Sequence, residues 1–389
     1  MSQIINANPT KKFFISMLIK DIPLRRAILD LIDNSIDGAN RISVDNDFDG
    51  LKVEIKFDGK KFLIEDNCGG ISLKTAKEYA FRFGRPNNAP SQNKSVGQFG
   101  VGMKRAIFKI GKSFKVISKN NNDFFKIEEN VDEWAEDKEN WNFEFEILDI
   151  KNEERENGTI IEVKNLYPQI SAYFEDDEFV KKLFLEIEAA HQYALNHNLM
   201  ISINGYKLNK TDNELKIADN LKPAYMVQNI PVNGLTINLK LYAGISERDP
   251  KLAGWYVYCN HRMILGSDKT HTTGWREGDI KGTSDVGRQY HNDFAYFRGY
   301  LYFESDDTSL LPWNTTKTGI DEDNEIYRGV REEMIKYMDP ILSFLRNVAN
   351  EKRIEGENAE LNKTITEATL QDISLIEKES KFIFPQKKS

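Results

Sequence analysis

The stretch from Leu24 to Asn40 (LRRAILDLIDNSIDGAN) constrains the fold more than any other part of this chain. Its apolar residues recur at helical spacing, so it predicts a largely buried helix, which we expect to stop near Gly38. Asp30, Asn34 and Asp37 lie at i, i+4 and i+7 and share one face. That spacing usually marks a solvated face, but polar side chains on a buried helix need partners. The stretch therefore predicts a functional helix.

The chemistry of these three residues suits a metal and water. An Asn amide oxygen is a hard ligand of the kind that Mg²⁺ accepts, and a neighbouring carboxylate can orient a water molecule. A second feature is IEDNCGGIS, residues 64–72, where Asp66 ends an expected strand and Gly69 and Gly70 follow. Glycines allow a backbone to approach a flat ligand, and a fixed carboxylate can accept a hydrogen bond from an amino group. Alone, this segment is typical of an ordinary strand end and turn.

A third feature is the glycine-rich segment SVGQFGVGMKRAIF, residues 95–108, in which the last glycine precedes an expected helix at 103–111. Backbone amides of such a loop and of a helix N-terminus together make an anion site. The spacing G-x-x-G-x-G is a weak signal alone and differs from the P-loop and dinucleotide motifs. Residues 84–102 are rich in Gly, Asn, Ser and Pro, and we expect them to form a long functional loop that nucleotide orders.

Taken together and in this order, the three features resemble the motifs of the GHKL superfamily, which includes the gyrase B subunit, MutL, the MORC ATPases and the large heat-shock chaperones. The acid-x-x-x-Asn-small-x-Asp motif matches Asp30 to Asp37, D-x-G-x-G matches Asp66 and Gly70, and the lid motif matches the glycine-rich segment. A weaker match is Gly158-Thr159 before a strand. The resemblance spans roughly residues 10–170.

The resemblance implies an ATPase that uses ATP and Mg²⁺, with Asp30 as general base and Asn34 as the metal ligand. Asp66 would hold the adenine amino group, and Thr159 would assist through a water molecule. The full set implied for nucleotide binding is Asn34, Asp37, Asp66, Gly70, Gly97, Gln98, Phe99, Gly100, Val101, Gly102, Lys104 and Thr159.

Two positions depart from the superfamily pattern. Asp30 stands where most hydrolysing members have Glu, and a side chain shorter by one methylene predicts slow turnover, because a misplacement of ~1 Å can cost about 10²-fold in rate. Cys68 stands at the first glycine of D-x-G-x-G, and it is interpreted as a small packed hydrophobe.

The second half of the chain has a looser match. LPWNTTKTGID, residues 311–321, resembles the lysine loop of the transducer domain in gyrase, MutL and MORC relatives. The resemblance implies that Lys317 reaches the terminal phosphate and acts in catalysis, where a mobile cation neutralises developing charge.

The predicted fold class is α+β. We expect a Bergerat-type α/β sandwich ATPase domain at 1–199, a smaller transducer-type α/β domain at 200–345, and a C-terminal helix with a loose tail at 346–389. The boundary near 200 rests on ISINGYKL, which we interpret as the first hairpin of a new domain. The apolar stripe of Phe13, Phe14, Met17 and Leu18 is expected either to cross a two-fold dimer or to pack on its own domain.

Composition narrows the setting. The net charge of −8 and the pI near 5.4 give no global electrostatic case for binding nucleic acid or a membrane. Nothing approaches the ~18 consecutive apolar residues of a membrane span, and the N-terminus does not resemble a signal peptide. Two distant cysteines form no metal motif, which favours a reducing, cytoplasmic location.

Two functions remain open from the sequence. One is a Mg-dependent ATPase that acts as an ATP-gated switch or dimerising clamp, in a DNA-linked or defence process with a separate effector protein. The other is a nucleotide-binding regulatory module with negligible turnover. The partners expected are ATP and a second copy of the chain, with DNA suggested by family analogy alone. A histidine kinase is disfavoured because the first histidine is His191.

Overall fold

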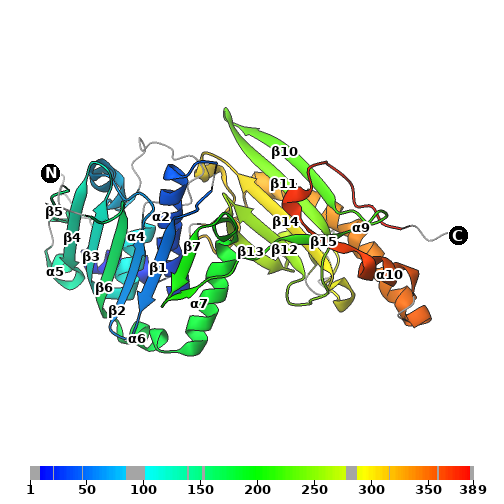
Figure 1. The fold of residues 1–389 in the computed structure, drawn as a ribbon, viewed down its shortest axis with the longest axis horizontal. Coiled ribbons are helices and arrows are strands. Elements are labelled where there is room, and N and C mark those ends of the chain that lie inside the picture. The colour runs from blue at the N-terminus through cyan, green and yellow to red at the C-terminus, as the bar shows by residue number, and fades with distance from the viewer. Residues whose placement is uncertain are drawn as a thin grey trace, which may run out of the picture. The chain divides into compact units, whose positions relative to one another are not determined.

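The computed structural model describes residues 9–20, 22–45, 47–84, 101–137, 140–150, 154–276, 287–314, 316–356 and 359–385. The chain forms two compact units, the first extending to Thr211 and the second beginning at Asp212 (Figure 1). The predicted α+β class is confirmed: the first unit is a GHKL-type sandwich, and the second has a mixed sheet and a long C-terminal helix. None of the helices in the described ranges combines the length and apolar composition that a membrane crossing requires.

The first unit is built on an eight-stranded sheet in the order β5-β4-β3-β6-β2-β1-β7-β8, and Figure 1 shows its strands side by side. Alternate residues of its inner strands are buried, so the sheet packs one face against helices. The strands are β1 (Lys52–Phe57), β2 (Lys61–Asp66), β3 (Gly111–Lys119), β4 (Phe124–Asn130), β5 (Phe145–Ile147), β6 (Gly158–Leu166), β7 (Met200–Ile203) and β8 (Tyr206–Lys207). The helices are α1 (Lys11–Lys20), α2 (Leu24–Ile42), α3 (Leu73–Thr75), the π-helical turn η1 (Ala76–Ala80), α4 (Gly102–Ile110), α5 (Val131–Glu136), α6 (Pro168–Phe174), α7 (Asp177–Ala190) and α8 (Gln192–Asn196).

Helix α2 is the centre of this unit and packs against both α4 and α7. It continues to Ile42, so the expected stop at Gly38 is wrong. The glycine serves close packing instead: a Cβ there would lie 2.6 Å from the Cys68 carbonyl oxygen and 3.2 Å from its Cβ. Cys68 is itself buried, as expected of a small packed hydrophobe. The last turns of α2 therefore lie directly on the segment that follows β2.

The first unit extends past the predicted boundary at 199. The hairpin β7–β8 belongs to the first sheet, because β7 pairs in parallel with β1, Lys52 opposite Met200 and Ile55 opposite Ile203. The segment interpreted as the start of a new domain therefore completes the old one. A strand's hydrophobic pattern shows that it pairs, but it does not show which distant strand it pairs with.

The second unit contains a five-stranded sheet in the order β10-β11-β14-β12-β13 and a separate two-stranded sheet, β15-β9. Helix α9 packs against β11 and β14. The strands are β9 (Glu214–Ile217), β10 (Ala224–Val232), β11 (Leu235–Ile245), β12 (Gly254–Cys259), β13 (Arg262–Asp268), β14 (Phe297–Glu304) and β15 (Thr369–Asp372). The helices are α9 (Glu325–Glu355) and α10 (Glu360–Glu367), with 3₁₀ turns η2 (His271–Thr273), η3 (Asn292–Phe294), η4 (Thr308–Leu310) and η6 (Ile373–Leu375).

The C-terminal segment is not the loose tail that the sequence predicts. Four tyrosines face one another across neighbouring strands, and Leu215 and Ile373 pack on this tyrosine cluster. Farther on, Ser380 pairs with the edge strand β10, and Phe384 contacts Phe344 of α9. The segment thus belongs to the second unit, because its scattered apolar residues find partners on both sheet and helix. The four tyrosines are Tyr225, Tyr242, Tyr300 and Tyr256.

Candidate functional site

At the predicted site, three hydrogen bonds hold the carboxylate of Asp66. It ends β2, where its Oδ2 accepts a hydrogen bond from Ser35 Oγ of α2 at 2.7 Å. Its Oδ1 accepts from the backbone N–H groups of Cys68 at 2.9 Å and Thr159 at 3.3 Å. Burial raises the pKa of this carboxyl above its usual range, and these hydrogen bonds oppose the rise. The carboxylate is therefore fixed in orientation before any ligand arrives.

The backbone around Asp66 leaves no room for side chains. Gly70 has φ +67°, and a Cβ there would lie 2.0 Å from the Lys119 carbonyl oxygen. A Cβ on Gly158 would lie 1.8 Å from the carbonyl oxygen of Asp66. The ends of β2 and β3 and the start of β6 thus meet at van der Waals distance. This requirement explains why glycine precedes Thr159 in the G-T pair.

Ser118 is a site residue that the sequence reasoning missed. It is fully buried at the end of β3 and its Oγ lies 3.0 Å from Thr159 Oγ1. The same oxygen accepts a hydrogen bond from the Ile71 backbone N–H at 2.8 Å. Ser118 therefore ties the turn after Asp66 to the strand that carries Thr159. No local motif marks it, although a polar residue at an inward strand position was a usable signal.

The polar face of helix α2 has one exposed and two buried side chains. Between Ala27 and Ala39, Asn34 is the one exposed residue, and Asp30 and Asp37 are buried. Because Asn34 is exposed inside a helical stretch that is otherwise buried, solvent reaches helix α2 at this position. The Asn34 side chain is thus available to a ligand, while helical spacing places Asp30 one turn before it on the same face.

Asp30 lies against the start of α4. Its Oδ2 accepts a hydrogen bond from Arg105 Nη2 at 2.7 Å, and both side chains are largely buried. Gly102 faces the same carboxylate, since a Cβ there would lie 3.3 Å from Oδ2. The structure thus brings the end of the predicted lid motif to the predicted base. Arg105 is a second residue that the sequence reasoning missed.

Lys104, predicted to bind nucleotide, is buried in this structure. Its Nζ donates to the Ala80 carbonyl oxygen at 2.6 Å and lies 5.8 Å from the centre of the Phe83 ring. Burial lowers the pKa of the ammonium to about 7. Its predicted role in binding stays a prediction.

Four predicted nucleotide-binding residues lie outside the described residues. Val101 is described, and its carbonyl accepts the Arg105 backbone N–H at 2.9 Å, so it begins α4 together with Gly102. The four are Gly97, Gln98, Phe99 and Gly100.

Lys317 lies in the second unit. It is buried, has φ +52°, and its Nζ lies 6.0 Å from the centre of the Trp313 ring. Its backbone N–H donates to the Asn314 carbonyl at 3.0 Å, which forms a tight turn. A left-handed, buried lysine in a tight turn is a constrained residue rather than a freely solvated one.

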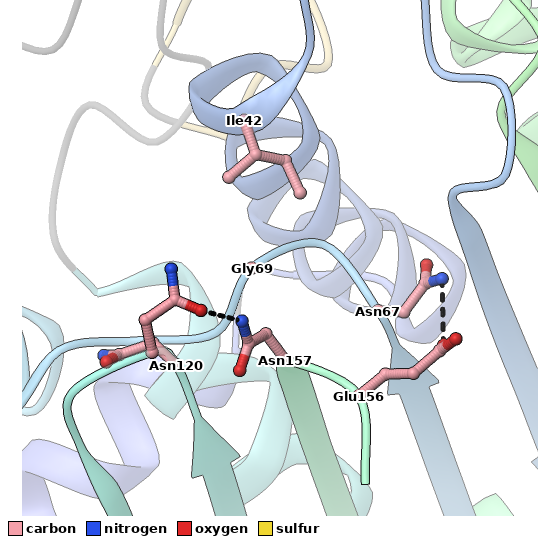
Figure 2. Close-up of a pocket in the computed structure, with 7 residues that line it drawn as sticks. Ile42, Asn67, Gly69, Asn120, Glu156 and Asn157 are labelled. Carbon is pink, nitrogen blue, oxygen red and sulfur yellow. Dashed lines mark hydrogen bonds between the residues drawn. The ribbon is translucent and has the colours of Figure 1, made fainter.

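A cavity of about 460 Å³ opens beside the turn that follows Asp66. In the polar lining of this cavity, Asn67 donates to Glu156 at 3.1 Å, as Figure 2 shows. Asn157, on the other side of Gly69, donates to the Asn121 side chain at 2.5 Å. Ile42 and Asn120 complete the lining, which includes none of the carboxylates discussed above. The cavity adjoins the site rather than containing its reactive groups.

Comparison with known families supports the same assignment. The model of the family described as Histidine kinase-, DNA gyrase B-, and HSP90-like ATPase matches residues 22–159. A search of curated proteins found no match to this chain. The matched range begins just before α2 and ends at Thr159, so it contains Asp30, Asn34 and Asp66. Residues 22–159 are therefore a GHKL-type ATPase domain, which binds and hydrolyses ATP.

Proposed function

We propose that this chain is a Mg-dependent ATPase in which Asp66 holds adenine, Asn34 binds the metal ion and Asp30 is the general base. The exposure of Asn34 within the buried stretch of α2 carries the proposal. It offers an amide oxygen to a ligand one helical turn from a buried carboxylate. Asp66, fixed by three hydrogen bonds, supplies the acceptor for an exocyclic amino group.

The residues present fit a magnesium ion that is bound mainly through nucleotide phosphates. Among the described ranges, no group of three or more His, Cys, Asp or Glu side chains forms a metal cage. Mg²⁺ commonly binds through one or two protein oxygens, with water and substrate phosphates as the other ligands, so a single Asn34 ligand suits it. When bound, Mg²⁺ would neutralise charge on the phosphates.

The side chains have separate tasks in hydrolysis. Asp66 accepts a hydrogen bond from the adenine amino group. Thr159 donates its backbone N–H to the same carboxylate and is the second, water-mediated partner of the adenine. Asp30 orients the attacking water and takes its proton as the water oxygen bonds to the γ-phosphorus and the bond from that phosphorus to the bridging oxygen breaks, so that ADP leaves. Because Asp30 is shorter than the usual Glu, we expect turnover to be slow.

Asn34→Ala tests the binding assignment. We expect it to abolish Mg-dependent binding of a non-hydrolysable ATP analogue in calorimetry, while Asn40→Ala, at the half-buried asparagine on the same helix, retains it. Asp30→Asn should bind the analogue and lose hydrolysis. Unchanged Mg-dependent affinity in Asn34→Ala would refute the metal assignment, and normal hydrolysis by Asp30→Asn would refute the base.

We further propose that ATP switches the chain between a monomer and a dimer. In α1, Phe14 packs on its own domain against Phe83, with ring centres 5.0 Å apart, and buried Lys11 donates to backbone carbonyls. Phe13 and Met17 remain 57% and 59% exposed. The predicted stripe therefore divides, and its outward half offers apolar surface to a second copy.

Lys317 would make the switch sensitive to the terminal phosphate. A charge-assisted contact contributes about 1.5–3 kcal/mol, which shifts an equilibrium roughly 10- to 150-fold. We expect Lys317→Ala to bind the analogue almost normally but not to dimerise, and the double variant Phe13→Ser, Met17→Ser to behave likewise. Light scattering with and without the analogue measures this. A wild-type mass that ignores nucleotide, or variants that respond as wild type does, would refute the switch.

We propose that the downstream target is a separate effector protein. By family analogy, we propose that this effector acts in a DNA-linked or defence process. A pull-down with the non-hydrolysable analogue, compared with one using ADP, tests this proposal. Capture that depends on the analogue and is lost in Asn34→Ala supports it, and capture that ignores nucleotide contradicts it.

A further inference from the structure

We infer that Arg105 is the positioning residue for Asp30, holding the carboxylate of the general base in its working orientation. The inference rests on the proposed role of Asp30. Its basis is the contact between Arg105 Nη2 and Asp30 Oδ2 at 2.7 Å, formed by side chains that are only 11% and 5% exposed. An ion pair so shielded from water is screened little by salt and keeps its geometry.

The place of Arg105 in its helix supports a role beyond helix stability. Helix α4 begins at Gly102, so Arg105 lies close to its N-terminus, and the first turn has no acidic residue. The N-terminal end of a helix carries partial positive charge, which disfavours a nearby cation. Asp30 supplies the compensating negative charge, and it comes from another helix, α2.

A second nitrogen of the Arg105 guanidinium is also buried. Arg105 Nε is buried and has no hydrogen-bond acceptor in the part of the chain that the structure describes. A buried donor without an acceptor is unfavourable. Among the described residues, the bond from Nη2 to Asp30 is a polar contact that offsets this cost, and the planar fork of Arg suits it to fixing a carboxylate.

The short side chain of Asp30 makes such positioning consequential. Asp has only two side-chain torsions. Gly102 lies beside the carboxylate, since a Cβ on this glycine would be 3.3 Å from Asp30 Oδ2. Arg105 holds Oδ2 at hydrogen-bond distance. Without Arg105 the carboxylate loses this restraint, and a base displaced by ~1 Å loses up to about 10²-fold in rate.

The test compares Arg105→Gln, Arg105→Lys and Arg25→Gln. Arg25 is the matched control, because it lies on the same helix as Asp30 and its Nε is bonded at 2.7 Å to Glu186, away from the site. We expect Arg105→Gln to lower kcat about 10- to 100-fold with KM and analogue affinity within about 2-fold of wild type. Arg105→Lys should recover part of the loss, and Arg25→Gln should change neither constant.

A double-variant comparison shows whether Arg105 acts through Asp30. Single-turnover rates with enzyme in excess over ATP are measured for Asp30→Asn alone and with Arg105→Gln. If Arg105 works through the base, adding Arg105→Gln to Asp30→Asn changes the rate by less than about 2-fold. Full additivity, or a loss expressed in KM and analogue affinity, would overturn the inference and assign Arg105 to phosphate binding.

The outcomes separate this inference from the proposed function. A wild type without Mg-dependent ATP binding, or an Asp30→Asn variant that hydrolyses normally, would remove the proposed function itself. A wild type that hydrolyses ATP, an inactive Asp30→Asn and a fully active Arg105→Gln would remove the role of Arg105 alone. If Arg105→Gln does not fold by circular dichroism, Arg105→Lys decides, since wild-type kcat in that variant would likewise contradict a requirement for the guanidinium geometry.

Discussion

A buried Asp33–His191 pair fixes the helix that carries the site, and its removal allows a quantitative prediction. His191 Nε2 lies 2.8 Å from Asp33 Oδ1, and the two side chains are 2% and 1% exposed. Asp33 immediately precedes Asn34 on α2, and His191 stands at the junction of α7 and α8. The pair is thus a polar link between the functional helix and the helices that follow the ATPase domain.

His191→Ala removes one partner of the pair and leaves the Asp33 carboxylate in the interior. Removing a buried hydrogen bond to a carboxylate in this way costs about 1.5–3 kcal/mol. For a unit of this size, 1 kcal/mol corresponds to roughly 2–4 °C in Tm, so we expect a fall of about 3–12 °C. Asp33→Ala added to His191→Ala should recover part of the loss, because the Asp33 carboxylate is then no longer left in the interior without His191.

The control is Lys112→Ala, which removes a surface pair of similar length. Lys112 Nζ lies 2.8 Å from Asp132 Oδ2, but these side chains are 43% and 61% exposed. Exposed pairs contribute about 0–1 kcal/mol, so Tm should change by no more than roughly 4 °C. The contrast between the two variants isolates burial as the cause.

The assay must report on the first unit, because the chain has two compact units. Thermal unfolding by circular dichroism gives the Tm, and native-state hydrogen exchange of α2 amides shows whether the loss is located there. A His191→Ala variant no less stable than Lys112→Ala, or one with unchanged exchange in α2, would refute the reasoning.

Three further outcomes follow from the structure. Gly70→Ala should lower Tm and weaken analogue binding in calorimetry far more than Gly205→Ala, because both have positive φ but only the former would bring a Cβ within 2.0 Å of the Lys119 carbonyl. Lys104→Met should raise Tm relative to wild type most below pH 7, and progressively less toward pH 10.5. The pKa of Lys104 in the folded wild type is lowered to about 7, so the stability of the wild type rises with pH between that value and the ordinary lysine pKa. Thermal melts over a pH series measure this. Affinity for the ATP analogue should fall on acidification while the pH is still above the usual carboxyl range, because burial raises the pKa of Asp66 and its protonated form is a poorer acceptor, and calorimetry across pH tests this.

The sequence by itself determined the local elements and the family of the first unit. The polar face of α2, the strand that ends in Asp66 and the helix that begins at Gly102 follow from periodicity and turn residues, which act over a few positions. The roles assigned to Asp30 and Asn34 in hydrolysis stay predictions. The family assignment of residues 22–159 is confirmed, since ordered motifs identify a domain even where each motif alone is weak.

Only the tertiary structure decided which distant residues meet. It placed Ser35 on Asp66, Arg105 on Asp30, and β7 beside β1, which moved the end of the first unit to Thr211. It also bound the C-terminal segment to the tyrosine cluster of the second sheet. These contacts join positions far apart in the chain, and they depend on packing and on the satisfaction of buried polar groups, neither of which leaves a periodic trace in the sequence.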